Sequence, residues 1–525
     1  MIIKTSQRID DVMMKQIIPI KCEEKIIDKL HSYSVKGLVE VSIGYTTSND
    51  FIYCIDEPSI EDSRITRNGN KKLSTNRNRY PQLEVVARVA SSVIAEGLDG
   101  LPTRVEELEK FAEKYNIDLD FLRSNIEILG YYVWKGISGY GKIYPIILDP
   151  RVEEVAINTP ERPVYVIHRD MDYGWIRTNI KLSRDELDNL VITLARKCGQ
   201  EISIAKPYLE ALLPEGHRVS ATFMSEITRH GSSLIIRKHI EEPIPPTQLV
   251  TWNVVNATLL AYLWLMLEYN STLLIVGPTA SGKTTLLQAL LLLLPPRSRI
   301  VTIEDTPELN LKHHENWDSL VTRYTYTKIE GLDIDLYNLS KLALRRRPDY
   351  FVIGEIRGEE ARIFIQAAAS GHGALATFHS DSVISALYRL KAPPINLGES
   401  FLQLIWAIIV IKRIRIANKY LRRVTEIVEV YPEEDGISLN TITKWIPQSD
   451  THSLSSVEEL IDKSRRLQQI ANNYGIDREH LVKDLYHRKR FLEESAIYDY
   501  RSFIDLIKNF YTKRYEEWYL ASSQD

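Results

Sequence analysis

A buried strand, a glycine-rich loop and a helix follow one another near the middle of the chain. Residues 277–284 read Gly-Pro-Thr-Ala-Ser-Gly-Lys-Thr, a complete GxxxxGK[ST] pattern. The apolar run 273–276 directly precedes the loop, and the leucine-rich run 285–294 directly follows it. In such a loop the glycines let backbone N–H groups turn toward phosphates, at the positive end of the helix dipole. These residues therefore predict a site for a nucleoside triphosphate.

The loop and the residue after it form the predicted nucleotide contacts. Lys283 is expected to reach the β- and γ-phosphate oxygens, and the Thr284 hydroxyl is expected to meet Mg²⁺. A turn that binds no ligand is the alternative, but the flanking strand and helix favour the phosphate loop. The predicted contacts are Gly277, Pro278, Thr279, Ala280, Ser281, Gly282, Lys283, Thr284 and Thr285.

Apolar runs of strand length alternate with helical segments between about 250 and 445, which predicts an α/β fold with a helix-covered parallel sheet. At 525 residues the chain is long enough for several structural units. The predicted segments are a variable N-terminal region with a basic linker (1–80), a helical bundle (81–145), an α+β domain (146–240), a proline-rich hinge (241–250), the α/β domain (251–445) and a helical C-terminal region (446–525).

Composition limits the remaining possibilities. Lys and Arg number 66 against 70 Asp and Glu, a net charge of -4, so the whole chain gives no electrostatic reason to favour nucleic acid. Its cysteines, Cys22, Cys54 and Cys198, show no metal-ligand spacing, and we expect neither a disulfide framework nor a zinc site, as in a reducing compartment. The longest apolar stretches fall short of the roughly 20 residues of a membrane helix. A soluble or peripheral protein is expected.

Four further motifs surround the phosphate loop in the sequence. An acidic box at 303–308 and an apolar strand ending in Glu355 both place carboxylates where an α/β sheet presents its ligands. A third motif, 371–379, has a histidine at each end of a strand, and a fourth, upstream of the hinge, contributes basic residues. The candidate residues of these motifs are Glu304, Asp305, Glu308, Glu355, His372, His379, Arg218 and Arg237.

This combination resembles the type II/type IV secretion ATPases, the hexameric motors of pilus assembly, archaellum rotation and secretion, and most closely their archaeal branch. The resemblance covers roughly 130–511, and residues 1–80 match nothing known to us. It implies a RecA-like phosphate-loop ATPase core in the 251–445 domain. The four-cysteine metal subdomain of many bacterial export members is absent, because no cysteine follows Cys198.

By that resemblance, ATP and Mg²⁺ are the cofactors, and Glu304, Asp305 and Glu308 order the metal and the water. Glu355 is the implied catalytic carboxylate, while His372 and His379 sense the γ-phosphate. The resemblance further implies that Arg218 and Arg237 approach the nucleotide from the upstream domain. Each basic residue and histidine could instead form an ordinary surface or core interaction. His313-His314 has no further ligands nearby in sequence, so a loop is favoured over a metal site.

The function implied by the resemblance is a homohexameric ATPase at the cytoplasmic face of the membrane, which docks on an integral membrane platform protein. Pilin-like subunits would be the indirect cargo, with no direct contact to nucleic acid. A nucleic-acid translocase or DNA-transfer ATPase is the main alternative, and a nonhydrolytic nucleotide switch is another. The motifs do not distinguish extension, retraction, archaellum rotation and secretion.

Overall fold

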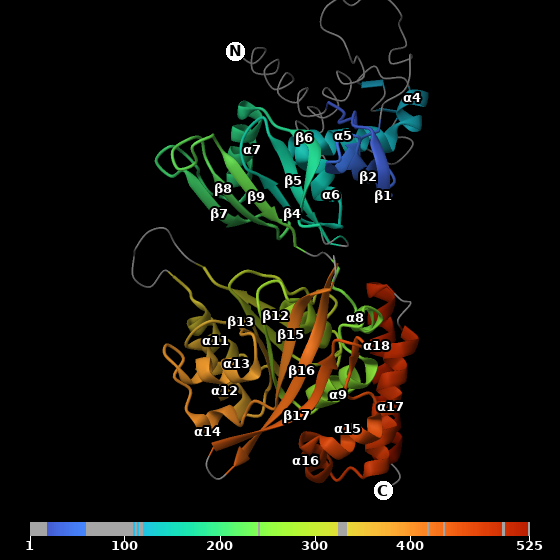
Figure 1. Cartoon of the computed structure of the whole chain (residues 1–525), viewed down its shortest axis with the longest axis vertical. Helices are drawn as coiled ribbons and strands as arrows, with labels where there is room; N and C mark the ends of the chain where they lie inside the picture. The colour runs from blue at the N-terminus through green and yellow to red at the C-terminus, as the bar shows by residue number, and fades with distance from the viewer. Residues whose placement is uncertain are drawn as a thin grey trace, which may run out of the picture. The chain divides into compact units, whose positions relative to one another are not determined.

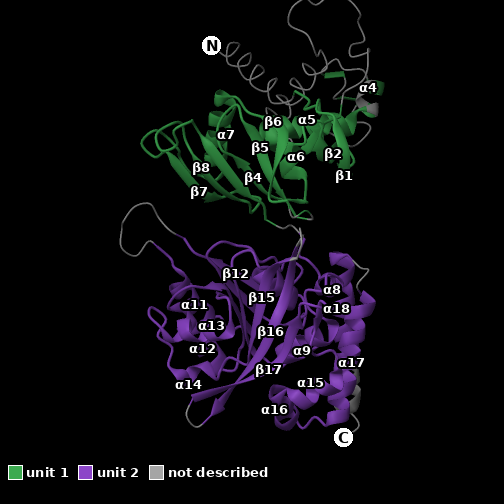
Figure 2. Cartoon of the chain, viewed as in Figure 1, with its two compact units in different colours: residues 1–239 green, residues 240–525 purple. Residues whose placement is uncertain are grey.

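The chain forms two compact units, residues 1–239 and 240–525 (Figure 2). The structure is a computed structural model, and it describes residues 18–58, 109–110, 113–114, 119–169, 171, 173–239, 242–323, 333–416, 419–433, 436–495 and 499–522. The division falls next to the predicted hinge. Residues 59–108, which include part of the predicted region 1–80 and the start of the predicted helical bundle 81–145, lie outside the described residues.

Unit 1 contains one nine-stranded sheet in the order β1-β2-β3-β6-β5-β4-β9-β8-β7. Helices α5 and α7 pack on it through buried residues such as Leu129, Leu187 and Val191. Its strands are β1 (Ile26–Val35), β2 (Val39–Thr46), β3 (Phe51–Asp56), β4 (Val152–Ile157), β5 (Pro163–His168), β6 (Trp175–Lys181), β7 (Tyr208–Leu212), β8 (Arg218–Thr222) and β9 (Ser233–Arg237). Its helices are α4 (Leu119–Ser124), α5 (Ile126–Ile137), the 3-10 turn η1 (Gly141–Ile143), α6 (Tyr144–Leu148) and α7 (Arg184–Lys197).

The N-terminal strands differ from the sequence-based expectation of a separate region. β3 pairs in parallel with β6 through Ile52 opposite Arg177 and Tyr53 opposite Thr178, so β1–β3 extend the sheet of the α+β unit. The local alternation of apolar and polar residues does not indicate which distant strand a strand pairs with, so the sequence pattern could not predict this pairing.

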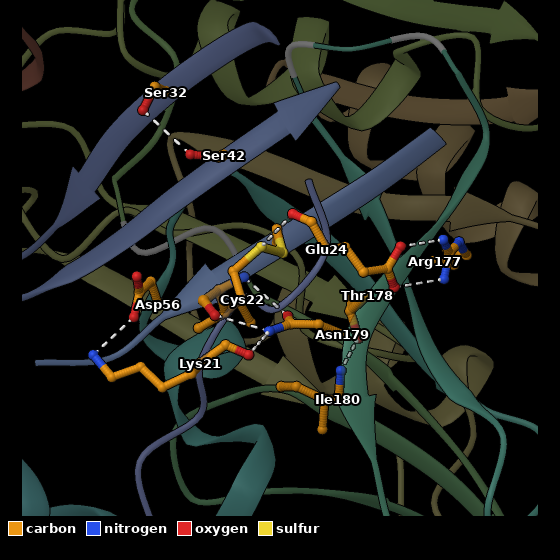
Figure 3. The surroundings of a disulfide bond; sticks show 12 residues. Lys21, Cys22, Glu24, Ser32, Ser42, Asp56, Arg177, Thr178, Asn179 and Ile180 are labelled. Atoms are coloured by element: carbon orange, nitrogen blue, oxygen red, sulfur yellow. Dashed lines mark hydrogen bonds and ion pairs between the residues drawn. A yellow bond between two sulfur atoms is a disulfide. The ribbon is translucent and has the colours of Figure 1, made fainter. Parts of the chain in front are cut away.

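A disulfide joins Cys22 to Cys54 on β3, and their Cα atoms are 5.7 Å apart (Figure 3). The expectation of no disulfide framework is thus corrected, since only folding brings together two cysteines that are 32 residues apart. Cys198 is free. Around the bridge, Lys21 pairs with Asp56 at 2.9 Å and Arg177 pairs with Glu24 at 2.6 Å, and both ion pairs are visible in Figure 3. These contacts attach the segment before β1 to the sheet.

Unit 2 contains a second nine-stranded sheet, in the order β12-β11-β13-β14-β10-β15-β16-β17-β18. The strands from β12 to β15 are parallel, and β15 to β18 are antiparallel. Its strands are β10 (Thr272–Gly277), β11 (Ile300–Glu304), β12 (Trp317–Val321), β13 (Tyr350–Ile356), β14 (Gly373–His379), β15 (Ala407–Ile416), β16 (Lys419–Glu433), β17 (Gly436–Ile446) and β18 (Thr451–His452). The predicted α/β class with a parallel, RecA-like sheet is confirmed.

Helices cover both faces of this sheet, with α11–α13 on one face and α9 and the C-terminal helices on the other (Figure 1). The helices of unit 2 are α8 (Pro246–Thr251), α9 (Ala257–Glu268), α10 (Lys283–Leu291), α11 (Leu336–Leu344), α12 (Glu360–Ala369), α13 (Val383–Lys391), α14 (Glu399–Leu402), α15 (Val457–Lys463), α16 (Arg465–Tyr474), α17 (Arg478–Glu494) and α18 (Tyr500–Ser522). Within the described part of the chain, no helix has the length and apolar character needed to span a membrane.

The C-terminal helices share the core of the α/β unit. The indole N–H of Trp264 on α9 donates to the Tyr511 hydroxyl at 2.8 Å, and that hydroxyl donates to the Leu293 carbonyl at 2.9 Å. The guanidinium of Arg488 stacks 4.6 Å from the Trp264 ring centroid and pairs with Glu268. The predicted C-terminal helical region is therefore packed into unit 2, because its apolar faces are buried against α9.

Candidate nucleotide site

The phosphate loop connects the end of β10 to the start of α10. Gly282 precedes the helix with φ +98°, a left-handed conformation that favours glycine. Gly277 ends the strand, and a Cβ there would lie 2.3 Å from the carbonyl oxygen of Ile411. Both glycines of the motif are therefore needed for the path of the backbone.

Lys283 is folded back on its own loop. Its Nζ donates to the carbonyl oxygens of Gly277 and Pro278, both at 3.0 Å. Burial lowers the pKa of the Lys283 ammonium, while Glu355 and Glu308 act in the opposite direction. The charges of these two carboxylates therefore act on the lysine.

Parallel pairing brings the His379 end of β14 to the phosphate loop. His379 lies beside Gly277 in the register of β14 and β10, and its Nε2 is 2.8 Å from the Thr279 hydroxyl. His372 precedes the opposite end of β14, roughly 20 Å away along a strand of this length. The structure therefore does not bring His372 to the phosphate loop of the same chain, because the strand between the two histidines is extended.

Arg357 connects the two acidic motifs. Its guanidinium donates to Oε2 of Glu355 from Nε at 3.0 Å and from Nη2 at 2.7 Å, and its Nη1 donates to Oδ2 of Asp305 at 3.0 Å. The Thr322 hydroxyl donates to Oδ1 of Asp305 at 2.8 Å. Arg357 was not among the residues predicted from the sequence, although it ends the motif that contains Glu355. Its guanidinium is planar and always charged, which suits a contact with a carboxylate.

Glu304 is buried at the end of β11 and holds the acidic loop. Its Oε1 accepts from the backbone N–H groups of Glu308 and Leu309 at 2.9 and 3.0 Å. Burial raises the pKa of Glu304 to about 8. A Cβ on Gly354 would lie 3.0 Å from Cγ of Glu304, so glycine before Glu355 leaves the space that this carboxyl occupies.

The donor set fits a Mg²⁺ ion bound together with a nucleotide. Oε2 of Glu304 is buried with no hydrogen-bond partner among the described residues. The half-buried Thr284 follows Lys283 at the start of α10, and Asp305 follows Glu304. No three His, Cys, Asp or Glu side chains of the described residues form a ready metal cluster. Mg²⁺ usually binds through one or two carboxylates and completes its shell with substrate phosphate and water.

The predicted arginines lie in unit 1. Arg218 on β8 and Arg237 on β9 are exposed cross-strand neighbours. Nε of Arg237 is 3.8 Å from Oε1 of Glu154, and burial raises the pKa of that carboxyl while Arg237 lowers it. The two arginines thus form one basic pair on the surface of unit 1.

The phosphate loop lies between β10 and α10, and acidic side chains and His379 lie at the ends of neighbouring parallel strands. This arrangement defines a phosphate-loop nucleotide-binding protein of the α/β class. Residues 141–480 match the family described as Type II/IV secretion system protein. The chain belongs to this family.

The chain is also similar to individual proteins. An uncharacterised protein of Methanocaldococcus jannaschii is 34% identical over 399 residues, which are 74% of this chain and 70% of that protein. The type IV secretion system protein PtlH of Bordetella pertussis is 32% identical over 272 residues, 47% of this chain and 78% of PtlH. The VirB11 ATPase of the Brucella suis type IV secretion system, solved with sulphate, covers 55% of this chain and 95% of its own at 26% identity, with a TM-score of 0.28.

Proposed function

We propose that the chain is a homohexameric ATPase motor, which hydrolyses ATP to power assembly of type IV pilus-like filaments or secretion through a membrane platform protein. The observation that supports it best is the convergence on one phosphate loop of Lys283, the Glu355 carboxylate and His379. Membership of the secretion-system family supports the same activity.

ATP would bind with its phosphates in the loop 277–285. Lys283 would leave the carbonyl oxygens of Gly277 and Pro278 and pair with the β- and γ-phosphates. Thr284, Glu304 and Asp305 would hold Mg²⁺, which neutralises phosphate charge when bound. The residues fit this exchange, because the lysine's present partners are weak neutral acceptors.

Glu355 would position the attacking water, with Glu308 ordering the water and metal beside it. Positioning and charge stabilisation account for most of the catalysis in phosphoryl transfer, so a carboxylate of ordinary basicity suffices. Arg357 fixes the Glu355 carboxylate through two hydrogen bonds. His379 would report the γ-phosphate to the loop through Thr279.

Arg218 and Arg237 would complete the site by neutralising charge on the transferring phosphoryl group, as arginine fingers do. We propose that they come from the unit 1 of a neighbouring subunit, which couples hydrolysis to movement at the proline-rich segment 241–250. The motor would act in the cytoplasm, at the inner face of the membrane, on an integral membrane platform, with pilin-like subunits as indirect cargo.

The test is Mg²⁺-dependent ATP turnover against protein concentration, with particle mass from light scattering. Lys283→Ala, Glu355→Gln and Arg218→Ala are compared with the exposed control substitutions Lys312→Ala, Glu315→Gln and Arg184→Ala. We expect turnover to rise with hexamer formation and to be lost only in the first three variants.

Turnover by a monomer that is indifferent to Arg218→Ala would contradict the proposal. Strong stimulation by DNA that weakens steeply with added salt would instead favour the nucleic-acid translocase.

A further inference from the structure

The hairpin of β15 and β16 places two arginines directly opposite one another beside the phosphate loop. Arg413 on β15 pairs with Arg422 on β16, immediately after the pair of Lys412 and Arg423. Like charges in opposed positions of a sheet are unfavourable in isolation. An anion held between or beside them would remove this penalty.

The side chain of Arg422 lies against the last glycine of the phosphate loop. A Cβ on Gly282 would lie 3.2 Å from Cδ and 4.0 Å from Nε of Arg422, and 3.5 Å from Cδ1 of Ile411. These residues all belong to unit 2, and β15 is the neighbour of β10 in the sheet. Arg422 therefore reaches the loop within a single chain.

Arg422 and Arg423 have opposite environments. Arg423 is buried, and its Nε and Nη2 donate to the two carboxylate oxygens of Asp450, each at 2.7 Å. Arg422 is exposed, and its guanidinium makes no hydrogen bond or ion pair with the described residues. Arg423 thus joins β16 to the turn before β18, whereas the donors of Arg422 are available to a ligand on the loop.

The side of the loop on which Arg422 lies indicates the part of the nucleotide that it meets. His379, Glu355 and Asp305 are on β14, on β13 and directly after β11, to one side of β10. These are the residues proposed to act on the γ-phosphate. β15 and β16 lie on the other side of β10, so the opposite end of a nucleotide across the loop would face Arg422.

We propose that Arg422 binds the α-phosphate and ribose end of the nucleotide from within the same subunit. The inference rests on the proposed function, since it takes the phosphate loop as the nucleotide site. A guanidinium suits this contact, because it is always charged and can donate two parallel hydrogen bonds to phosphate oxygens. The contact would exist equally with ATP and ADP, so it would contribute to affinity more than to the chemical step.

The experiment measures ADP and ATP affinity by calorimetry and ATP turnover by steady-state kinetics, on the full chain. Arg422→Ala is compared with Arg422→Lys and with Arg415→Ala, a control that removes the same charge further along β15. We expect Arg422→Ala to weaken ADP and ATP binding alike by about tenfold or more and to raise KM, with kcat nearly unchanged. The nucleotide affinity of Arg422→Lys should lie between those of the parent and Arg422→Ala. Arg415→Ala should bind nucleotide as the parent does.

Equal ADP affinity in the parent and Arg422→Ala would overturn the inference while leaving the proposed function intact. A loss confined to kcat would also overturn it, because the arginine would then act in the transition state. A parent that binds no nucleotide would overturn both proposals. If Arg422→Ala does not fold, as judged by circular dichroism, Arg422→Gln replaces it and must show the same loss.

Discussion

The Thr279 hydroxyl and Nε2 of His379 lie 2.8 Å apart, although 100 residues separate them in the chain. The contact joins the phosphate loop, which follows β10, to the end of β14, the parallel neighbour of β10. A change in the loop when phosphate binds would therefore act directly on His379.

His379→Ala should lower kcat by about ten- to a hundredfold, because the loop loses a contact that positions it, while ADP affinity changes less. Steady-state turnover and calorimetric ADP binding measure the two effects. His31→Ala, at an exposed position of unit 1, is the control. Parent-like turnover in His379→Ala would show that the contact has no catalytic role.

Arg357→Ala should reduce kcat by about a hundredfold at nearly constant KM, because Glu355 loses both hydrogen bonds that orient it. Arg357→Lys should restore little, since a lysine cannot reproduce the paired donors. Single-turnover hydrolysis at saturating ATP measures the chemical step. Full activity in Arg357→Lys would mean that only the charge matters.

Mixing two inactive variants tests whether the arginine and the phosphate loop of one site come from different subunits. Lys283→Ala subunits retain Arg218, and Arg218→Ala subunits retain the loop, so mixed hexamers should recover a measurable fraction of turnover. Each variant alone, taken through the same dissociation and reassembly, is the control. No recovery, in mixtures shown by mass to be mixed hexamers, would place both residues in the same subunit.

Reducing the Cys22–Cys54 disulfide should destabilise unit 1 by roughly 2–4 kcal/mol, the usual effect of opening a loop of this length. Thermal unfolding of the full chain with and without reductant measures the loss. The variant Cys22→Ser should unfold like the reduced parent and should not respond to reductant, whereas Cys198→Ser should behave as the parent. One accessible thiol in the unreduced, denatured chain is expected, and three would exclude the bridge.

Unit 2 should lose stability as the pH falls from 6.5 to 4 through His313. Burial lowers the pKa of this imidazole from 6.5 to about 4, so the unfolded chain binds the proton first. Its Nδ1 lies at hydrogen-bond distance, 2.8 Å, from the Tyr500 hydroxyl. His313→Gln should reduce the decline in melting temperature over this range, and His480→Gln, on an exposed side chain, should not. If the melting temperature of His313→Gln declines as much as that of the parent, groups other than His313 cause the loss of stability.

Much of the fold class was predictable because its signals are local. The phosphate loop is eight consecutive residues, and the predicted helical C-terminal region contains α17, which begins after the Asp477 cap. In the same region Ser464 separates two helices, since it ends α15 and caps α16 by accepting from the Leu467 N–H at 3.0 Å. A short turn of this kind differs little in sequence from a continuous helix.

By itself, the sequence determined the phosphate loop, the acidic and histidine motifs and the alternation of strands with helices, because each depends on neighbouring residues. Only the tertiary structure decided that Cys22 meets Cys54, that Arg357 holds Glu355 and Asp305, and that Arg422 lies on Gly282. It also separated His372 from His379. These relationships depend on strand order and register, which are set by packing over the whole sheet, and periodicity along the chain does not encode them.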